Sequence, residues 1–416
     1  MPKPHLPLIR RPLPFKALSW TLRILENIGL MKQPLNTESL IAAAQRRARL
    51  DNFGDETFRE PLRRLIDCCE SEARLNTIGK LSLTEDVLQL LINRLQLQRD
   101  RHSWPWIGEE AIVAPLFILG LPRTGTTLLH GLLAQDHDAF SVPMTWEVMF
   151  PSPPSSLGQK GRIKRTERRL RWFHLLAPEF EKIHPVSAYF PQECIAIMSH
   201  TFMSDQFGAM YTIPTYEAWL RKQDMRPVYQ FHRDFLQQLQ YGRPARRFVL
   251  KAPHHMFSIE ALFATYPDAL VVQMHREPLE ILPSAASLTR VLRSVFSDFV
   301  DQAAIGNELT KFWEEALEKS LVARNGFRRD AFVDVEYTDL VHNPIEVLRR
   351  IYNWLGRDLS REVELRMRTF LESTSSSKYG RHSYTLAAFD MDPVNLSERF
   401  GSYRTRFNLQ RLLRRR

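Results

Sequence analysis

Apolar residues recur with helical spacing through residues 38–110 and predict a series of helices. In residues 84–100 (TEDVLQLLINRLQLQRD), leucines stand three or four positions apart, as on the buried face of an amphipathic helix. The first of these helices has Asn36 or Thr37 at its start, and both residue types cap helix N-termini. We therefore predict that residues 1–110 form an N-terminal helical extension.

The pattern changes after residue 110, where short apolar runs replace the long helical periods. Strands that alternate with helices form mostly parallel sheets with helices on their faces. The sequence therefore predicts an α/β domain over residues 111–416. Four runs have the length of buried strands, each followed by a polar turn and a helical segment: 115–120 (PLFILG), 247–250 (RFVL), 269–274 (ALVVQM) and 331–337 (AFVDVEY).

A long stretch, residues 137–246, separates the first two predicted strands and is too long to be structureless in a compact domain. It contains many aromatic residues and prolines, and a basic segment at 159–172 (QKGRIKRTERRLRW) that fits a solvated helix face. Open α/β sheets bind ligands at the carboxyl ends of their strands. We therefore predict a helical insertion that forms a lid and an acceptor pocket over that edge.

The composition is that of a globular protein with a large core, since 44% of the 416 residues are hydrophobic and 25% are charged. The formal net charge of +10 has two interpretations. One is a solvated basic surface with a basic tail at 409–416, and the other is attraction to anionic ligands or to an anionic membrane. No recognisable nucleic-acid-binding motif is present, so nucleic acid is not a predicted partner.

The cysteines and the N-terminus bear on location. Cys68, Cys69 and Cys194 fit neither a disulfide framework nor a zinc spacing, which suits a reducing, cytoplasmic location. The first thirty residues lack the core and cleavage site of a signal peptide, and no apolar run reaches the roughly 18 residues of a membrane span. Residues 15–31 fit a basic amphipathic helix, either packed on its own domain or in peripheral contact with a membrane.

The turn after the first predicted strand carries the clearest chemistry (FILGLPRTGTTLL, 117–129). Gly120 and Gly125 have the spacing of the phosphate-binding loop G-x-x-x-x-G-K-[ST], and Thr127 fills the hydroxyl position. Thr126 stands where that loop has lysine, and Arg123 supplies a cation three residues earlier. A strand–loop–helix with this spacing predicts a P-loop-like anion site, but a magnesium triphosphate needs the missing lysine and an acidic strand end.

The elements of this loop suit a phosphate or sulfate group. Backbone N–H groups of residues 121–127 can surround an anion, and the following helix directs its N-terminus at it. Arg123 adds a planar fork of donors, and the hydroxyl of Thr124 adds another donor. Gly125 permits close approach of the backbone.

With this altered loop, LPRTGTTLL, the sequence resembles the sulfotransferases that use 3′-phosphoadenosine 5′-phosphosulfate (PAPS). It is most similar to the larger bacterial members whose loop reads P-R-[ST]-G-T-T, and the resemblance covers most of residues 38–408. The resemblance implies PAPS as co-substrate and no metal. It also implies that Arg123 contacts the sulfuryl and bridging oxygens of the donor. The implied 5′-phosphosulfate site consists of Arg123, Thr124, Gly125, Thr126 and Thr127.

Other motifs agree with this family. The family binds the 3′-phosphate with an arginine at a strand end and a serine eight residues later, and Arg276 and Ser284 match (HREPLEILPS). Tyr337 matches a tyrosine near the adenine, with core packing as the alternative. The segment 377–386 (SKYGRHSYTL) resembles a late basic loop that closes on the 3′-phosphate, which makes Lys378 and Arg381 candidates.

The resemblance also suggests catalytic residues. Lys251 ends the second predicted strand, where the family has a lysine near the reacting sulfate, and His255 fits the K-x-P-x-H form of that motif. Transfer to a hydroxyl needs a base to accept its proton. We prefer Glu147 as this base, because the related branch has a glutamate after the loop, while Glu193, His184 and His255 are alternatives.

The predicted function is that of a sulfotransferase that moves the sulfuryl group of PAPS to a hydroxyl by in-line, metal-independent transfer. The aromatic and apolar residues of the insertion predict an apolar small molecule or lipid as the acceptor, and ordinary core packing is the alternative explanation for them: Phe190, Met203, Phe207, Met210, Tyr211, Tyr216 and Trp219.

Two other functions remain open, a magnesium-dependent P-loop kinase or nucleotidase and a non-catalytic nucleotide-binding or membrane-surface scaffold.

Overall fold

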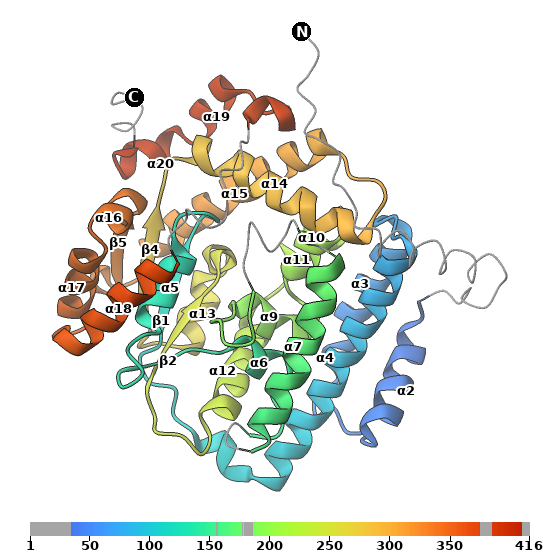
Figure 1. Ribbon diagram of the computed structural model, residues 1–416. Helices are drawn as coiled ribbons and strands as arrows, with labels where there is room; N and C mark the ends of the chain where they lie inside the picture. The colour runs from blue at the N-terminus through green and yellow to red at the C-terminus, as the bar shows by residue number, and fades with distance from the viewer. Residues whose placement is uncertain (1–34, 155–156, 177, 179–185, 375–384, 410–416) are drawn as a thin grey trace.

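Figure 1 shows the computed structural model, which describes residues 35–154, 157–176, 178, 186–374 and 385–409. The amphipathic helix predicted at residues 15–31 and the basic tail lie outside these ranges. No helix among the described residues is long and apolar enough to cross a bilayer.

The N-terminal part is helical, as predicted. Asn36 caps the first helix, because its side-chain oxygen accepts a hydrogen bond of 2.9 Å from the backbone N–H of Ser39. The leucine face of the long third helix is buried. The helices are α2 (Thr37–Ala48), α3 (Arg59–Ser71), α4 (Thr77–Ser103) and the 3₁₀ helix η1 (Pro105–Glu109).

A parallel five-stranded sheet forms the centre of the α/β part, in the order β2-β3-β1-β4-β5. All four predicted strands are confirmed. The sequence did not predict β2, because a two-residue edge strand is too short to show a period. The strands are β1 (Leu116–Gly120), β2 (Phe140–Ser141), β3 (Arg247–Lys251), β4 (Leu270–His275) and β5 (Phe332–Glu336).

The strand order determines where a ligand can bind. The central strand β1 has β3 on one side and β4 on the other, so the chain changes direction across the sheet at β1. Open α/β sheets bind ligands at the carboxyl ends of strands beside such a switch point. In the register, Ile118 lies opposite Lys251 and Gly120 lies opposite Met274. The residues that follow β1, β3 and β4 therefore meet at one edge.

Helices cover both faces of the sheet. Leu116 and Ile118 pack on the side of α5, α17 and α18, whereas Phe117 and Leu119 pack on the side of α12 (Arg226–Gln240), α13, α14 and α15. The helices of this part are α5 (Thr126–Leu133), α13 (Ile259–Thr265), α14 (Pro278–Phe296), α15 (Gln302–Arg324), α16 (Tyr337–His342), α17 (Pro344–Trp354), α18 (Arg361–Ser373), α19 (Pro393–Arg399) and α20 (Gly401–Arg406), with η3 (Pro253–Phe257), η4 (Arg329–Ala331) and η6 (Leu386–Phe389).

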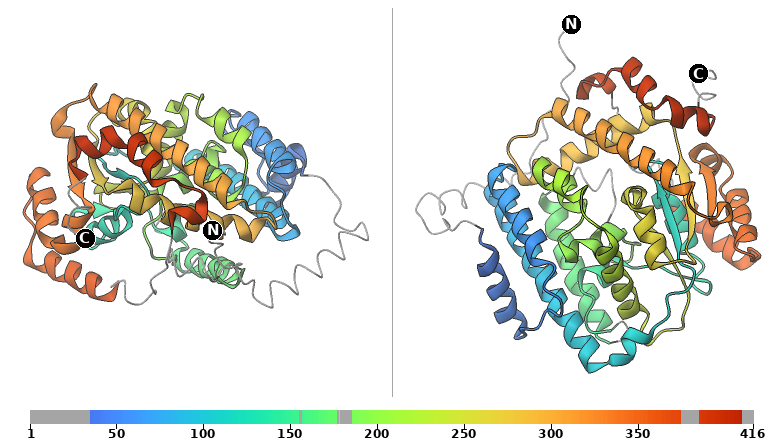
Figure 2. Two further views of the ribbon diagram at one scale, coloured as in Figure 1. Left: turned by 90° about the horizontal axis from the view of Figure 1, so that it is seen from above. Right: turned by 180° about the vertical axis from the view of Figure 1, so that it is seen from behind.

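The insertion, residues 137–246, is mostly helical, as predicted. It packs against the N-terminal helices, because Leu65 of α3 and Leu88 of α4 share a hydrophobic core with Phe207 and Tyr216. Both figures show the insertion between the N-terminal helices and the sheet (Figures 1 and 2). Its helices are α6 (Thr145–Met149), α7 (Gln159–Leu176), α9 (Cys194–Met198), η2 (Ser199–Thr201), α10 (Gln206–Met210), α11 (Pro214–Leu220) and α12 (Arg226–Gln240).

Candidate active site

The loop after β1 makes a tight turn that requires glycine. Gly120 has φ +143°, and a Cβ there would lie 2.5 Å from the carbonyl oxygen of Met274. Gly125 has φ +87° and precedes α5. Inside the turn, the Thr124 hydroxyl donates a hydrogen bond of 2.7 Å to the carbonyl of Leu121. The first N–H groups of α5 have no partner within the helix, so the turn has the elements of an anion site.

Arg276 follows β4 and lies against this turn. Its Nη1 donates a hydrogen bond of 2.8 Å to the carbonyl oxygen of Arg123, and Glu280 forms an ion pair with it at 3.3 Å. The guanidinium carbon lies 4.0 Å from the ring centroid of Tyr337, and that ring packs against Gly125. The structure therefore brings the loop, the strand-end arginine and the candidate adenine-side tyrosine together.

Of the other residues predicted to bind the donor, Ser284 lies within the described residues. Ser284 lies on α14, the helix that follows Arg276, and is 8% exposed. Lys378 and Arg381 lie outside the described residues, as does His184.

A buried lysine and a half-buried glutamate form an ion pair beside the loop. Lys251 is the last residue of β3 and is 2% exposed, and its Nζ forms an ion pair with Oε1 of Glu193. The same Nζ donates to the hydroxyl of Thr127 at 3.3 Å. An ammonium has three N–H groups, so Lys251 retains a third donor beyond these two contacts.

The pair opens into a cavity of about 870 Å³, a size typical of small-molecule sites. Arg123, Lys251 and Glu193 give it a charged end. The remaining lining comes mainly from α4, α5, α7 and α10 and is largely apolar: Leu83, Leu90, Leu128, Leu170, Phe173, Phe207, Met210 and Leu292. One cavity therefore combines fixed charges with room for a large apolar molecule.

The apolar residues that the sequence singled out divide into two groups. Phe190, Phe207, Met210 and Tyr211 line the cavity. Packing inside the hydrophobic core accounts for the other three, Met203, Tyr216 and Trp219.

Glu147, the preferred base, lies outside this lining. It is 1% exposed; Oε1 accepts a hydrogen bond of 2.5 Å from Arg243, and Oε2 accepts one of 2.9 Å from the backbone N–H of Met144. The hydrogen bond from Met144 caps α6, and the contact with Arg243 is a structural ion pair. The geometry therefore argues against the base role predicted for Glu147 and favours its alternative, Glu193.

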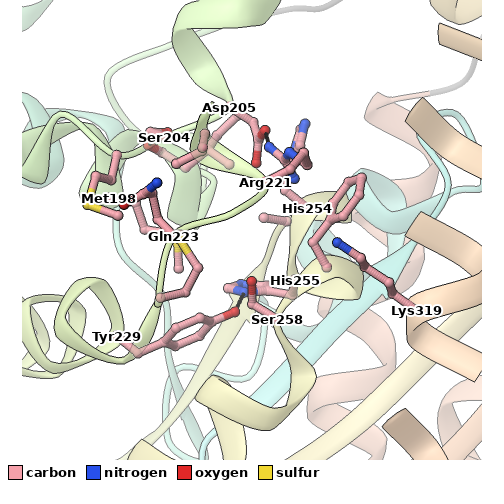
Figure 3. A pocket seen from close by; sticks show the side chains of 16 residues that line it. Met198, Ser204, Asp205, Arg221, Gln223, Tyr229, His254, His255, Ser258 and Lys319 are labelled. Carbon is pink, nitrogen blue, oxygen red and sulfur yellow. Dashed lines mark hydrogen bonds and ion pairs between the residues drawn. The ribbon is translucent and has the colours of Figure 1, made fainter. Parts of the chain in front are cut away.

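His255 also does not line the cavity that Lys251 and Glu193 share. Figure 3 shows it with Tyr229 at a separate cavity of about 50 Å³, and its Nδ1 lies 2.6 Å from the Tyr229 hydroxyl. Burial lowers the pKa of His255 well below its ordinary value. The catalytic role predicted for His255 is not supported by this position.

Sequence reasoning missed several polar groups of the cavity. His130 on α5 lines it and lies 3.1 Å, through Nε2, from the carbonyl oxygen of Val249. Asp86 and Arg169 form an ion pair there, and Gln89 donates to Asn93 at 2.7 Å. A histidine on an apolar helix is typical of a core residue, and nothing in the sequence indicates that α4 and α7 face each other.

The environment of His130 predicts an acid-sensitive contribution to stability. Burial, helped by the nearby charge of Lys251, lowers the pKa of His130 to about 3, against about 6.5 in the unfolded chain. Its neutral form therefore contributes stability that is complete above pH 6.5 and is lost as the pH falls below that value.

When the pH is lowered from 7.5 to 5.5, we expect the free energy of unfolding to fall in both proteins. The fall should be about 1.4 kcal/mol larger in the wild type than in His130→Gln. Glutamine preserves a donor for the Val249 carbonyl and does not titrate. Urea unfolding of both proteins at the two pH values measures the difference. Equal pH dependence would show that His130 is not held neutral.

The fold and the site define an α/β protein with a turn suited to anions at the switch point of its sheet, next to a large apolar cavity. Residues 115–361 match the model of the sulfotransferase family. This match covers more than half of the chain, and the protein belongs to that family. Family membership favours the predicted sulfotransferase over the kinase or nucleotidase alternative.

Known relatives support the assignment. The chain is 26% identical over 297 residues to Stf3 of Mycobacterium bovis, an omega-hydroxy-beta-dihydromenaquinone-9 sulfotransferase, covering 67% of this chain and 71% of the relative. The crystal structure of sulfotransferase STF1 from Mycobacterium tuberculosis is similar with a TM-score of 0.80 and 32% identity, covering 89% of this chain and all of that one. STF9 from Mycobacterium avium gives a TM-score of 0.81 at 26% identity, covering 91% and 98%.

Proposed function

We propose that this sulfotransferase moves the sulfuryl group of PAPS to a hydroxyl of an apolar small molecule or lipid. One observation carries the proposal: Lys251, which is buried and paired with Glu193, contacts Thr127 at the edge of the glycine turn, and both members of the pair line a largely apolar cavity of about 870 Å³. Residues suited to bind an anionic donor therefore lie next to a cavity suited to an apolar acceptor.

On the donor side, residues 121–127 with Arg123 hold the 5′-phosphosulfate, and Arg276 with Ser284 holds the 3′-phosphate. The contact of 2.8 Å between Arg276 and the Arg123 carbonyl supports this, because a nucleotide bisphosphate needs two cationic positions near each other. Tyr337 lies beside the adenine, where the stacked guanidinium of Arg276 fixes its ring. Lys378 and Arg381 remain proposed contacts of the 3′-phosphate.

In the reaction, Glu193 accepts the proton of the acceptor hydroxyl as its oxygen attacks sulfur. The bond between sulfur and the bridging oxygen breaks, and the bisphosphate leaves with the electron pair. The third N–H of Lys251 and the guanidinium of Arg123 stabilise the charge on the transferred group. These cations and the loop N–H groups supply the positive potential, so the transfer needs no metal.

The acceptor side fits a molecule that is mostly apolar and bears a hydroxyl. Phe173, Phe207 and Met210 line the same cavity as Glu193, so the hydroxyl can face Glu193 while the apolar part packs on these side chains. The relative named for a menaquinone-derived lipid supports a lipid-like acceptor. We propose a cytoplasmic enzyme, with the basic N-terminal helix as a peripheral membrane contact.

Incubation of the protein and sulfur-labelled PAPS with a cell lipid extract tests this function. Mass spectrometry is expected to detect a lipid product heavier by one labelled sulfate, formed without added metal. Donor binding without any sulfated product would favour a non-catalytic scaffold. Tight ATP binding that requires magnesium would favour a P-loop nucleotidase.

Arg276→Ala is expected to weaken binding of 3′-phosphoadenosine 5′-phosphate by about 10- to 100-fold, since a hydrogen bond to a charged group contributes about 1.5–3 kcal/mol. Turnover at saturating donor should change little, because Arg276 lies away from the reacting bond. Calorimetric titration measures the affinity, and Arg329→Ala, an exposed arginine on η4, is the control. Loss of turnover with unchanged affinity would overturn the role given to Arg276.

A further inference from the structure

The helix α7 has two faces of different character. Its inner face buries Arg162 and Thr166 and contributes Leu170 and Phe173 to the cavity. Along its outer face, positively charged residues follow one another three or four positions apart and lead to a tryptophan and a leucine. The exposed residues of this stripe are Lys160, Lys164, Arg168, Arg171, Trp172 and Leu175.

The end of this stripe is apolar although it lies at the surface. Trp172 is 60% exposed and Leu175 is 43% exposed. Tyr189 and Phe190, in the segment after α7, are 57% and 41% exposed, and Phe190 also lines the cavity. An exposed tryptophan next to cationic side chains, as Trp172 is to Arg168 and Arg171, is typical of proteins that contact the bilayer interface.

The cations of the stripe are available to an external partner. Within the part of the chain that the structure describes, no carboxylate pairs with Lys160, Lys164, Arg168 or Arg171. The only acidic residue of α7 is Glu167. Each basic residue near an anionic membrane surface contributes about 1 kcal/mol, so four together complement such a surface.

The position of α7 connects this stripe to the cavity. Figure 2, left, shows α7, in green, at the edge of the molecule. Trp172 lies next in sequence to Phe173, which lines the cavity. A bilayer in contact with the outer face would therefore lie beside a cavity suited to apolar molecules.

We propose that the α7 docking surface, made by the stripe, binds the face of an anionic lipid bilayer. Lys160, Lys164, Arg168 and Arg171 contact lipid phosphates, and the side chain of Trp172 enters the interface. Passage of the acceptor from the bilayer into the cavity rests on the proposed function, whereas the docking itself does not.

Sedimentation with vesicles tests this surface in the full chain. The probes are vesicles of equal parts phosphatidylglycerol and phosphatidylcholine, vesicles of phosphatidylcholine alone, and a DNA duplex. The α7 variant carries Lys160→Gln, Lys164→Gln, Arg168→Gln, Arg171→Gln and Trp172→Ala. A matched control, with the same change of charge and aromatic content at exposed positions elsewhere, carries Lys311→Gln, Arg328→Gln, Arg329→Gln, Arg350→Gln and Trp106→Ala.

Wild type and control are expected to bind the anionic vesicles, and the α7 variant to bind them at least about tenfold more weakly. Binding to neutral vesicles should be weak for all three proteins. Equal binding of the α7 variant and the wild type to anionic vesicles would overturn the proposal, as would binding to DNA without binding to vesicles. If the α7 variant misfolds by circular dichroism, Lys160→Glu with Lys164→Glu serves as the second variant and is expected to show the same loss.

Sulfation of detergent-dispersed lipid extract separates the two proposals. The α7 variant should retain this activity, because the substituted side chains do not line the cavity. A wild type that binds anionic vesicles but forms no sulfated product leaves the docking surface intact and contradicts the proposed function. A wild type that sulfates the dispersed extract but does not bind the vesicles contradicts the docking surface alone.

Discussion

Replacing Glu193 with glutamine is expected to lower turnover by about 10²- to 10⁴-fold, the range that a positioned general base contributes. Glutamine has the same shape, and its amide oxygen can still accept the hydrogen bond of Lys251, but it cannot take up the proton of the acceptor. Donor affinity should change little. Single-turnover kinetics with labelled PAPS give the rate, and calorimetry with 3′-phosphoadenosine 5′-phosphate gives the affinity.

Glu147→Gln is the matched control for this variant. It removes the charge that pairs with Arg243 at 2.5 Å, so it should lower the free energy of unfolding and leave turnover within a few-fold of wild type. The reverse pattern, with turnover lost in Glu147→Gln and retained in Glu193→Gln, would restore Glu147 as the base.

Replacing Lys251 with methionine is expected to lower turnover by about 10²- to 10³-fold, the usual cost of losing one donor that stabilises developing charge. Methionine retains most of the buried stem of Lys251 but removes the ammonium that contacts Glu193 and Thr127. Rapid-quench measurement of the chemical step at saturating donor checks the size of the effect.

A double-mutant cycle controls this prediction. Lys251 and Glu193 are in direct contact, so their effects on turnover should be coupled. The double variant, Lys251→Met with Glu193→Gln, should therefore lose much less turnover than the product of the two single fold losses. Fully multiplicative losses would show two independent residues. Normal turnover in Lys251→Met would remove Lys251 from the chemistry.

The glycine turn and its contact with Arg276 could be predicted because the sequence signals for them are local. The glycines at 120 and 125 are set by backbone conformation within one turn, and the structure gives both a positive φ. Arg276 stands at the end of an apolar run, and parallel strands bring their carboxyl ends to one edge. The sequence therefore predicted the sheet, the turn and the meeting of Arg276 with the loop.

Which of the two glutamates lies beside Lys251 could not be predicted, because it depends on contacts between distant parts of the chain. Lys251 and Glu193 are 58 positions apart, and Arg243 and Glu147 are 96 positions apart. Both glutamates lie in the insertion near short helices, with no period to indicate which one faces the cavity. Only the packing of the insertion on the sheet separates a glutamate beside the lysine from one in a structural ion pair.

The contribution of α4 to the cavity was also hidden from the sequence. Asp86 of α4 pairs with Arg169 of α7, across 83 positions. Neither helix alone shows which residues of the other it contacts. The cavity arises from the way the N-terminal extension packs on the insertion, which no single segment encodes.

A crystal structure of the protein with 3′-phosphoadenosine 5′-phosphate tests the central claim most directly, since that claim concerns where the two ends of the donor bind. We predict the 5′-phosphate against the N–H groups of residues 121–127, and the 3′-phosphate about 2.7–3.2 Å from the guanidinium of Arg276. A nucleotide bound elsewhere, or with its 3′-phosphate away from Arg276, would contradict the account.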